Sequence, residues 1–115
     1  MAQPAVYIDV RSPTEGIRIL DIQGEIAGSA EEALFAAHGA AGSRSRTVIL
    51  NLSAVQSIDS AGAGLLIALV AHARKQGQRL LAYGLSEQCR RAFELTHLDE
   101  AIGLYTDEAE ALGSL

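Results

Sequence analysis

Alternating apolar and polar residues predict two strands at the start of the chain. Val6, Ile8 and Val10 alternate with polar or aromatic neighbours, and residues 17–26 are dense in branched side chains. A period of two is typical of a strand that buries one face. The turn-forming residues 12–16 between the two runs predict that the strands form a hairpin.

A helical repeat follows the predicted hairpin. Small and apolar residues recur at helical intervals from Ala30 to Ala37, which predicts a helix that ends near Gly39. Ser29 stands three residues before Glu32, which is the spacing of a capping box. We therefore expect the Ser29 side chain to cap this helix.

The middle of the chain alternates between strand and helix patterns. Residues 47–52 are a continuous apolar run with one Asn, short enough for a central buried strand. A long apolar stretch that begins within residues 60–64 predicts a helix to about Gln76, ended by Gly77. Residues 79–83 predict the next strand.

The last third predicts two short helices with a strand between them. Ser86 is expected to cap the first helix, which would turn four side chains toward the core: Cys89, Ala92, Phe93 and Leu95. Residues 102–105 predict the strand. Asp107 and Glu110 repeat the capping spacing before a terminal helix that runs through Leu112.

The predicted order is ββαβαβαβα, which indicates an α/β fold. Helical crossovers make neighbouring strands parallel, so we expect a mixed, mostly parallel sheet of about five strands with about four helices. With 115 residues, of which 49% are hydrophobic and 20% charged, the chain can bury one core and keep a polar surface. We expect a single domain over residues 1–115.

Charge and composition narrow the classes of partner and location. Fourteen acidic residues outnumber nine Lys and Arg, and the net charge of −5 argues against direct binding to nucleic acid. We expect a cytoplasmic protein without membrane insertion for three reasons. The chain has a single cysteine, and no signal-peptide pattern is present near Met1. Its apolar stretch, 65–73, is shorter than the ~20 residues of a membrane span. Five basic residues of the third quarter form either a solvated helix surface or one docking patch: Arg74, Lys75, Arg79, Arg90 and Arg91.

The residues give little support to catalysis, metal binding or a cofactor. No two of His38, His72 and His97 have the spacing of metal ligands on a helix, and we expect His97 to occupy a turn at positive φ. Residues 62–64, Gly-Ala-Gly, lack the third glycine or the Gly-Lys-Ser/Thr of nucleotide-binding loops. Spacing identifies no general base for Ser60. We therefore expect a protein that is not an enzyme and has no catalytic residues, metal or cofactor.

The segment 58–64, Ile-Asp-Ser-Ala-Gly-Ala-Gly, carries the most functional information. It lies between a β-branched run and a long apolar run, which places Asp59 and Ser60 at the start of a helix. One interpretation is that Asp59 or Ser60 is simply the N-cap. The other is that Ser60 presents a hydroxyl beside free backbone N–H groups, which would receive a phosphate well.

Four segments together resemble a known family. They are Gly24-Glu25-Ile26, residues 48–52, residues 58–66, and residues 80–83 followed by a helix that ends Phe-Glu-Leu. The third is the most specific, because an apolar strand, six intervening residues and Asp-Ser-small-Gly occur in the expected order. The chain resembles the STAS family, the sulphate-transporter and anti-sigma factor antagonist domain, over nearly its whole length.

The resemblance implies a mixed sheet with helices mainly on one face and a function as an anti-sigma factor antagonist. Unmodified protein would bind an anti-sigma factor that is itself a kinase and so release a sigma factor. Phosphorylation of Ser60 by that kinase would end the binding, and a phosphatase would reverse it. The loop at residues 24–28 would lie beside Ser60 and join the contact surface. The expected partner-binding residues are Gly24, Glu25, Ile26, Ala27, Ile58, Asp59, Ser60, Ala61, Gly62 and Ala63.

Small size and position beside Ser60 indicate individual roles, and the chain also departs from the family pattern at two positions. Asp59 would shape the loop, Gly62 would let the partner approach closely, and Ala61 and Ala63 would keep the rim low. Ala27 stands where members often have Asp, and Ala61 where a second hydroxyl usually follows. One alternative is therefore a STAS subunit of a membrane transporter or lipid-trafficking complex, which the apolar run 65–71 also motivates. A nucleotide- or ligand-sensing STAS domain is another.

Overall fold

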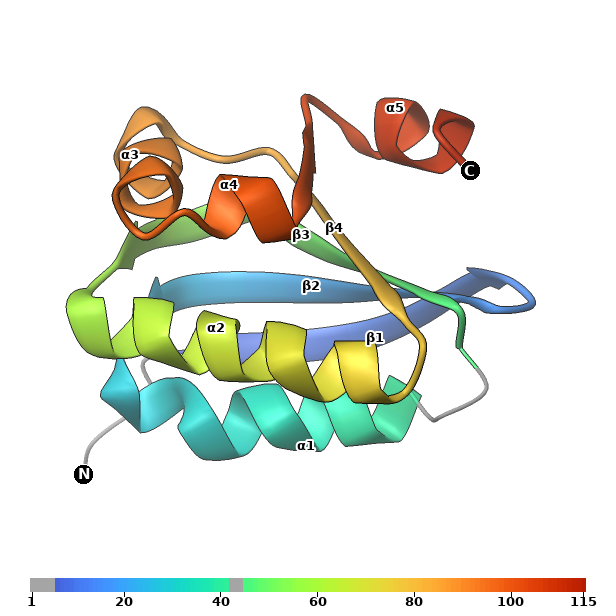
Figure 1. Ribbon diagram of the computed structural model, residues 1–115, viewed down its shortest axis with the longest axis horizontal. Helices are drawn as coiled ribbons and strands as arrows, with labels where there is room; N and C mark the ends of the chain where they lie inside the picture. The colour runs from blue at the N-terminus through green and yellow to red at the C-terminus, as the bar shows by residue number, and fades with distance from the viewer. Residues whose placement is uncertain (1–5, 42–44) are drawn as a thin grey trace.

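Five strands form one sheet in the order β1-β2-β3-β4-β5 in the computed structural model (Figure 1). The structure describes residues 6–41 and 45–115. β1 and β2 pair antiparallel, and β2, β3, β4 and β5 run parallel to one another. The strands are β1 (Val6–Thr14), β2 (Ile17–Ile26), β3 (Thr47–Ile58), β4 (Arg79–Tyr83) and β5 (Gly103–Tyr105).

Helices connect the parallel strands, as the alternating pattern predicted. The 3-10 helix η1 (Gly28–Ala30) and α1 (Glu31–Ala41) follow β2, and α2 (Ser60–Lys75) follows β3. The last three helices are α3 (Glu87–Leu95), α4 (Leu98–Ala101) and α5 (Glu108–Gly113). The short helix α4 was not predicted, so the chain has one α-helix more than expected within the part that the structure describes.

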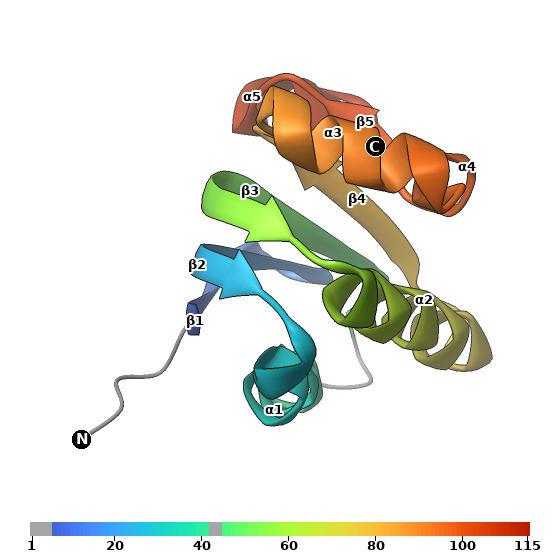
Figure 2. The same cartoon turned by 90° about the vertical axis from the view of Figure 1, so that its left-hand side faces the viewer.

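The larger core lies on one face of the sheet. It joins buried side chains of the sheet and of four helices: Leu50 of β3, Leu34 of α1, Leu66 of α2, Phe93 of α3 and Leu98 of α4. Figure 2 shows α1, α2 and α4 on the same side of the sheet, with α5 on the other. This confirms the prediction of a mixed, mostly parallel sheet with helices mainly on one face.

The smaller core lies on the opposite face, beneath α5. Ala111 of α5 packs with Ile19 of β2, Ile49 of β3 and Leu81 of β4, all of which are buried. The central strand is therefore covered on both faces, which explains why residues 47–52 read as an uninterrupted apolar run rather than an alternating one.

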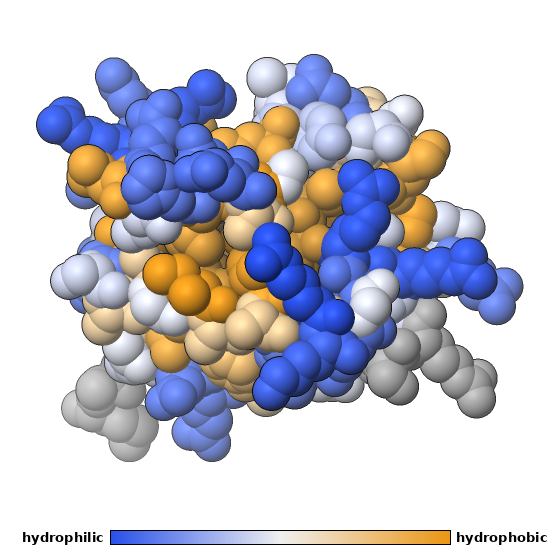
Figure 3. Space-filling view, viewed as in Figure 1, coloured by the Kyte–Doolittle hydropathy of each residue, from blue (hydrophilic) through white to orange (hydrophobic). Residues whose placement is uncertain are grey.

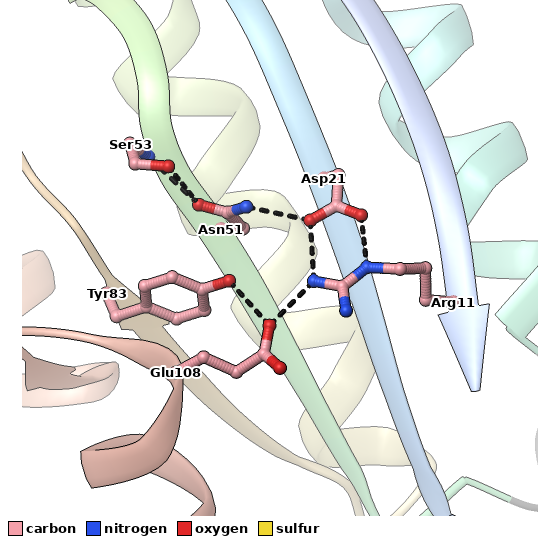
Figure 4. Close-up of polar contacts among 6 residues, drawn as sticks. All are labelled: Arg11, Asp21, Asn51, Ser53, Tyr83 and Glu108. Carbon is pink, nitrogen blue, oxygen red and sulfur yellow. Dashed lines mark hydrogen bonds and ion pairs between the residues drawn. The ribbon is translucent and has the colours of Figure 1, made fainter. Parts of the chain in front are cut away.

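A polar network on this second face ties α5 to the sheet (Figure 4). The Arg11 guanidinium of β1 forms an ion pair with Asp21 of β2 and another, at 2.7 Å, with Glu108 of α5. The Tyr83 hydroxyl donates to Glu108 at 2.9 Å, and the Asn51 side-chain amide donates to Asp21 at 2.7 Å. Four strands and the last helix thus meet through charged and polar side chains on that face.

The network shifts the protonation of its members. Hydrogen bonding to Arg11 lowers the pKa of Asp21 and of Glu108 below their ordinary values. Partial burial and the hydrogen bond to Glu108 raise the pKa of Tyr83 to about 12. The network is therefore strongest when both carboxyl groups are ionised and the phenol is protonated.

The structure corrects the predicted start and end of α1. The chain already coils through η1, where the backbone N–H of Ala30 donates to the Ala27 carbonyl at 2.9 Å, and no side chain caps that turn. Ser29 lies inside η1, so the predicted Ser29 cap is wrong. The helix also continues past Gly39 to Ala41.

The structure confirms the predicted caps of α3 and α5 and two predicted turn residues. Ser86 caps α3 by accepting from the Cys89 N–H at 3.1 Å, and Asp107 caps α5 by accepting from the Glu110 N–H at 2.8 Å. Gly77 follows α2 at φ +70, and His97 has the expected positive φ, at 61. All of these confirm the turn and cap assignments.

Leu95 does not face the core. Its side chain is 74% exposed, whereas Cys89 and Phe93 of the same helix are fully buried. Two positions after Phe93 correspond to a turn of about 200° around a helix, which places Leu95 on the opposite side. The prediction that it packs inward is wrong.

Candidate functional site

The site is built where β2 and β3 end side by side. The two parallel strands stay paired to their last residues, with Ile26 opposite Ile58. The backbone N–H of Asp59 then donates to the Ile26 carbonyl at 3.3 Å. The chain leaves β3 directly beside the segment that leaves β2, which confirms that the loop after the second strand lies next to Ser60.

β3 is longer than predicted, and its additional residues reach this site. The expected strand stops at Leu52, but β3 continues to Ile58. Its last part pairs with β2, with Val55 opposite Gly24 and Ser57 opposite Glu25. Register shifts between the two strands accompany this pairing. The extension carries the chain to the carboxyl end of the central strand, where Asp59 caps the next helix.

Asp59 is the N-cap of α2. Its carboxylate accepts from the Gly62 N–H at 2.7 Å, and its carbonyl accepts from the Ala63 N–H at 2.8 Å. Its extended backbone, with φ −87 and ψ 179, is the conformation that an N-cap requires. Of the two capping candidates in the sequence, the structure selects Asp59 and leaves Ser60 as the first residue of the helix.

The Ser60 hydroxyl is exposed at this first helical position. No protein group among residues 6–41 and 45–115 hydrogen-bonds to it. The backbone N–H groups of Ser60 and Ala61 also have no acceptor in that part of the chain. These groups and the positive end of a 16-residue helix can stabilise an added anion.

Gly62 has a different role from the one predicted. A Cβ at this position would lie 1.8 Å from the Ile26 carbonyl oxygen, and the residue is buried. The close approach that glycine permits is therefore between α2 and the end of β2, inside the molecule. Gly62 fixes the loop against the sheet rather than making room for a partner.

The ten predicted contact residues divide by exposure. Glu25, Asp59, Ser60 and Ala61 are exposed, and Gly24, Ala27 and Ile58 are partly exposed. Ile26 and Ala63 are buried, at 1% and 3% exposure, and so is Gly62. These three cannot offer side-chain surface to a partner. They support the seven accessible residues from below, and the site surface is defined here as those seven.

A second feature at the same end of the sheet was not assigned to the site from the sequence. A hollow between β3 and α3 is lined by Gln56, Ser86, Glu87, Gln88, Arg90, Arg91 and Glu94. Figure 3 shows hydrophilic side chains gathered over α3. The strand pattern that would have placed Gln56 here is obscured, because the extension of β3, Ser-Ala-Val-Gln-Ser-Ile, has no regular alternation of apolar and polar residues.

The five basic residues of the third quarter do not form one patch. Arg79 begins β4, and Arg90 and Arg91 lie on α3, which follows the other end of that strand. Arg74 and Lys75 end α2 and belong with Arg79. Of the two alternatives left open by the sequence, the structure excludes one docking patch, because β4 separates its two halves.

Two other reactive side chains, His38 and Cys89, are buried in the interior of the protein. The buried His38 ring bonds to the Gln78 side chain at 2.8 Å and meets the His72 ring edge-on at 5.4 Å between centroids. Cys89 is fully buried, with its sulfur 3.7 Å from the Val55 carbonyl oxygen. Over the described ranges, no three potential metal ligands cluster, and no helix is long and apolar enough to span a bilayer.

Comparison with known families decides what this arrangement is. The profile of the STAS domain matches residues 7–111. The chain belongs to the STAS domain family. The match spans the strands, the Asp59–Ser60 loop and the helices that position it, in agreement with the resemblance inferred from the sequence.

Solved structures share the fold of this STAS domain. An anti-sigma factor antagonist from Mycobacterium paratuberculosis matches with a TM-score of 0.81 and 28% identity, over 98% of this chain and 96% of that one. The anti-sigma factor antagonist SpoIIAA in its unphosphorylated form gives 0.77 and 22%, over 94% and 95%. A sulfate transporter family protein from Wolinella succinogenes gives 0.79 and 22%, over 90% and 88%. The fold is thus common to antagonists and to a transporter-family protein.

Proposed function

We propose that this STAS domain is an anti-sigma factor antagonist that is controlled by phosphorylation of Ser60. Unmodified protein would bind an anti-sigma factor with kinase activity in the cytoplasm, and the phosphorylated form would release it. The observation that carries the proposal is the exposed Ser60 hydroxyl, the first residue of α2, with free N–H groups beside it.

The local geometry supports a switch that acts on binding rather than on folding. A phosphate on Ser60 would add about −1.5 to −2 charges at neutral pH, and the start of α2 stabilises negative charge. Within the part of the chain that the structure describes, the exposed hydroxyl has no hydrogen bond that modification would break. The domain should therefore keep its fold when phosphorylated.

The same charge would oppose association. Ser60 lies beside the exposed Asp59 carboxylate, and Glu25 is exposed at the end of the neighbouring strand. Phosphorylation would concentrate negative charge on a surface that already carries two acids. A partner packed against this surface would have to desolvate a dianion, which lowers affinity.

Two of the structurally similar proteins support the proposal, because they are anti-sigma factor antagonists. The Mycobacterium paratuberculosis protein, at 28% identity, is an anti-sigma factor antagonist. SpoIIAA is known in an unphosphorylated and a phosphorylated form, and both share the fold. Ala61 and Ala27, which replace a hydroxyl and an acid expected from the family resemblance, are accessible beside Ser60 and would set which kinase is recognised.

The transporter-subunit alternative loses one of its two motives. The apolar run 65–71 contributes Leu66, Leu69 and Val70 to the main core, where each is at most 7% exposed. Most of the large apolar residues of this run therefore pack inside the domain and do not need a membrane complex to explain them.

The proposal is tested by incubating the domain with the cognate anti-sigma factor kinase and labelled ATP. The wild type should incorporate phosphate. A control variant, Ser53→Ala, changes a different exposed serine, which lies on β3, and should incorporate phosphate too. A Ser60→Ala variant should incorporate none. Equal incorporation by the Ser60→Ala variant would remove Ser60 from the proposed role.

A further inference from the structure

Basic side chains gather at the end of the sheet opposite the site surface. The parallel strands β2, β3 and β4 begin side by side, with Ile17 opposite Thr47 and Thr47 opposite Arg79. Arg18, Arg46 and Arg79 lie at or next to these starts, and Arg74 and Lys75 end α2 nearby. We call these five residues the basic edge.

The backbone holds the basic edge together. The N–H of Arg46 donates to the Gly16 carbonyl at 2.8 Å, and the N–H of Arg79 donates to the Arg46 carbonyl at 2.9 Å. Arg18 and Arg46 line one hollow with Glu15 and Gly16, and Arg74 and Arg79 line a second one. Neighbouring strands are separated by about 4.8 Å, so the backbones of Arg18, Arg46 and Arg79 lie close together at the starts of β2, β3 and β4.

None of the five forms an ion pair with the described part of the chain. Four of them are exposed and Arg18 is partly exposed. Arg74 and Lys75 complement the negative end of the α2 dipole, but Arg18, Arg46 and Arg79 lie outside the helices and have no such explanation. Because the net charge of the chain is −5, this edge is a local concentration of cations on an acidic protein.

We propose that the basic edge docks on a surface of anionic phospholipid headgroups. Clusters of four to eight Lys and Arg bind such surfaces at about 1 kcal/mol per residue, which predicts weak and reversible attachment. Mobile lipid headgroups can match separate guanidinium groups without a shaped pocket. Neither hollow is lined by an aromatic side chain, on which the bases of a single-stranded nucleic acid would stack.

This orientation leaves the site surface free. β2 starts at the basic edge and ends beside Ser60, and its 10 residues span roughly 30 Å. That distance is about three Debye lengths at 0.1 M salt. A domain attached through the basic edge would therefore present Ser60 away from the membrane, and a charge at Ser60 would not affect attachment.

The test is co-sedimentation of the full chain with vesicles of equal parts phosphatidylglycerol and phosphatidylcholine, and with pure phosphatidylcholine. The wild type should bind only the anionic vesicles, and less at higher salt. Arg46→Gln/Arg79→Gln should partition about 30-fold more weakly. The control Arg90→Gln/Arg91→Gln has the same net charge and changes exposed arginines of α3, so it should stay within about twofold of the wild type.

Several results would overturn the proposal. The first is that the wild type fails to bind anionic vesicles at low salt, and the second is that the two double variants lose vesicle binding equally. The third is that the wild type binds duplex DNA as tightly as vesicles at the same phosphate concentration. Each of these results would contradict docking on lipid. Displacement from vesicles by millimolar inorganic phosphate would indicate a phosphate pocket instead of a lipid surface. A Ser60→Glu variant should bind vesicles like the wild type, which separates this test from that of the proposed function.

Discussion

The first turn of α2 rests directly on the end of β2, because Gly62 lies against the Ile26 carbonyl. A Cβ on residue 62 would stand 1.8 Å from that oxygen. The contact joins the Asp59–Ser60 loop to the segment that follows β2, so that two loops far apart in the sequence form one surface. The contact also fixes the position of Ser60 relative to the end of β2.

Gly62→Ala should destabilise the domain by about 3 kcal/mol or more, because backbone must move to relieve the contact. Gly64→Ala is the matched control two residues later in the same helix, where a Cβ would meet nothing within 4 Å. It should stabilise the domain by about 0.5–1 kcal/mol through helix propensity. Urea unfolding measures both, and equal effects of the two variants would contradict the proposed contact.

Asp59 should matter to stability as a hydrogen-bond acceptor rather than as a charge. Asp59→Ala removes the cap on the Gly62 N–H and should cost about 1 kcal/mol. Asp59→Asn keeps an acceptor oxygen and should cost much less, since Asn and Asp cap equally well. If Asn were as destabilising as Ala in the same unfolding assay, the capping role would be wrong.

The network around Arg11 predicts a loss of stability in acid. Because the pKa values of Asp21 and Glu108 are lowered in the folded state, their contribution is complete above the unfolded values, about 3.9 and 4.3. It is lost as the pH falls through the lowered folded values. Arg11→Gln should weaken this decline and cost at most about 1 kcal/mol at neutral pH, as expected for exposed ion pairs.

Unfolding free energies measured from about pH 6 down to about pH 3 would show the difference in slope. Arg90→Gln removes an exposed arginine of α3 and should leave the slope of the wild type intact. An unchanged slope in Arg11→Gln would show that the network does not control acid stability.

His38 predicts a second pH dependence. Burial lowers the pKa of His38, and the ring of His72 faces it. The unfolded chain therefore takes up a proton first, and stability should fall as the pH drops below about 6.5. His38→Gln should flatten this step, whereas His97→Asn, at an exposed left-handed position that Asn tolerates, should keep it. Thermal unfolding between about pH 7.5 and 5 distinguishes them.

Local signals were sufficient to predict most of the fold. The periodicity of β1, the apolar run of β3 and the caps Ser86 and Asp107 each depend on neighbouring residues alone, and all appear in the structure. The Ser29 cap failed because the chain can begin coiling earlier as a 3-10 turn. Leu95 failed because its helix buries a narrow face, which short-range composition does not reveal.

The candidate site could be proposed from the sequence, but its internal arrangement could not be predicted. The Asp59–Ser60 segment at a strand-to-helix boundary was recognisable from spacing and resemblance. The approach of Gly62 to Ile26 depends on how β2 and β3 pair at their ends, and the polar extension of β3 hides that pairing. The separation of Arg79 from Arg90 likewise depends on the direction of β4 within the sheet.

We propose that charge on Ser60 controls association with the anti-sigma factor kinase. The most direct measurement is titration calorimetry of that kinase with unmodified domain and with domain phosphorylated at Ser60. Phosphorylation should weaken binding at least about 100-fold, because the partner would have to desolvate a dianion, while the thermal unfolding temperature changes little. Equal affinities of the two forms would contradict the proposal.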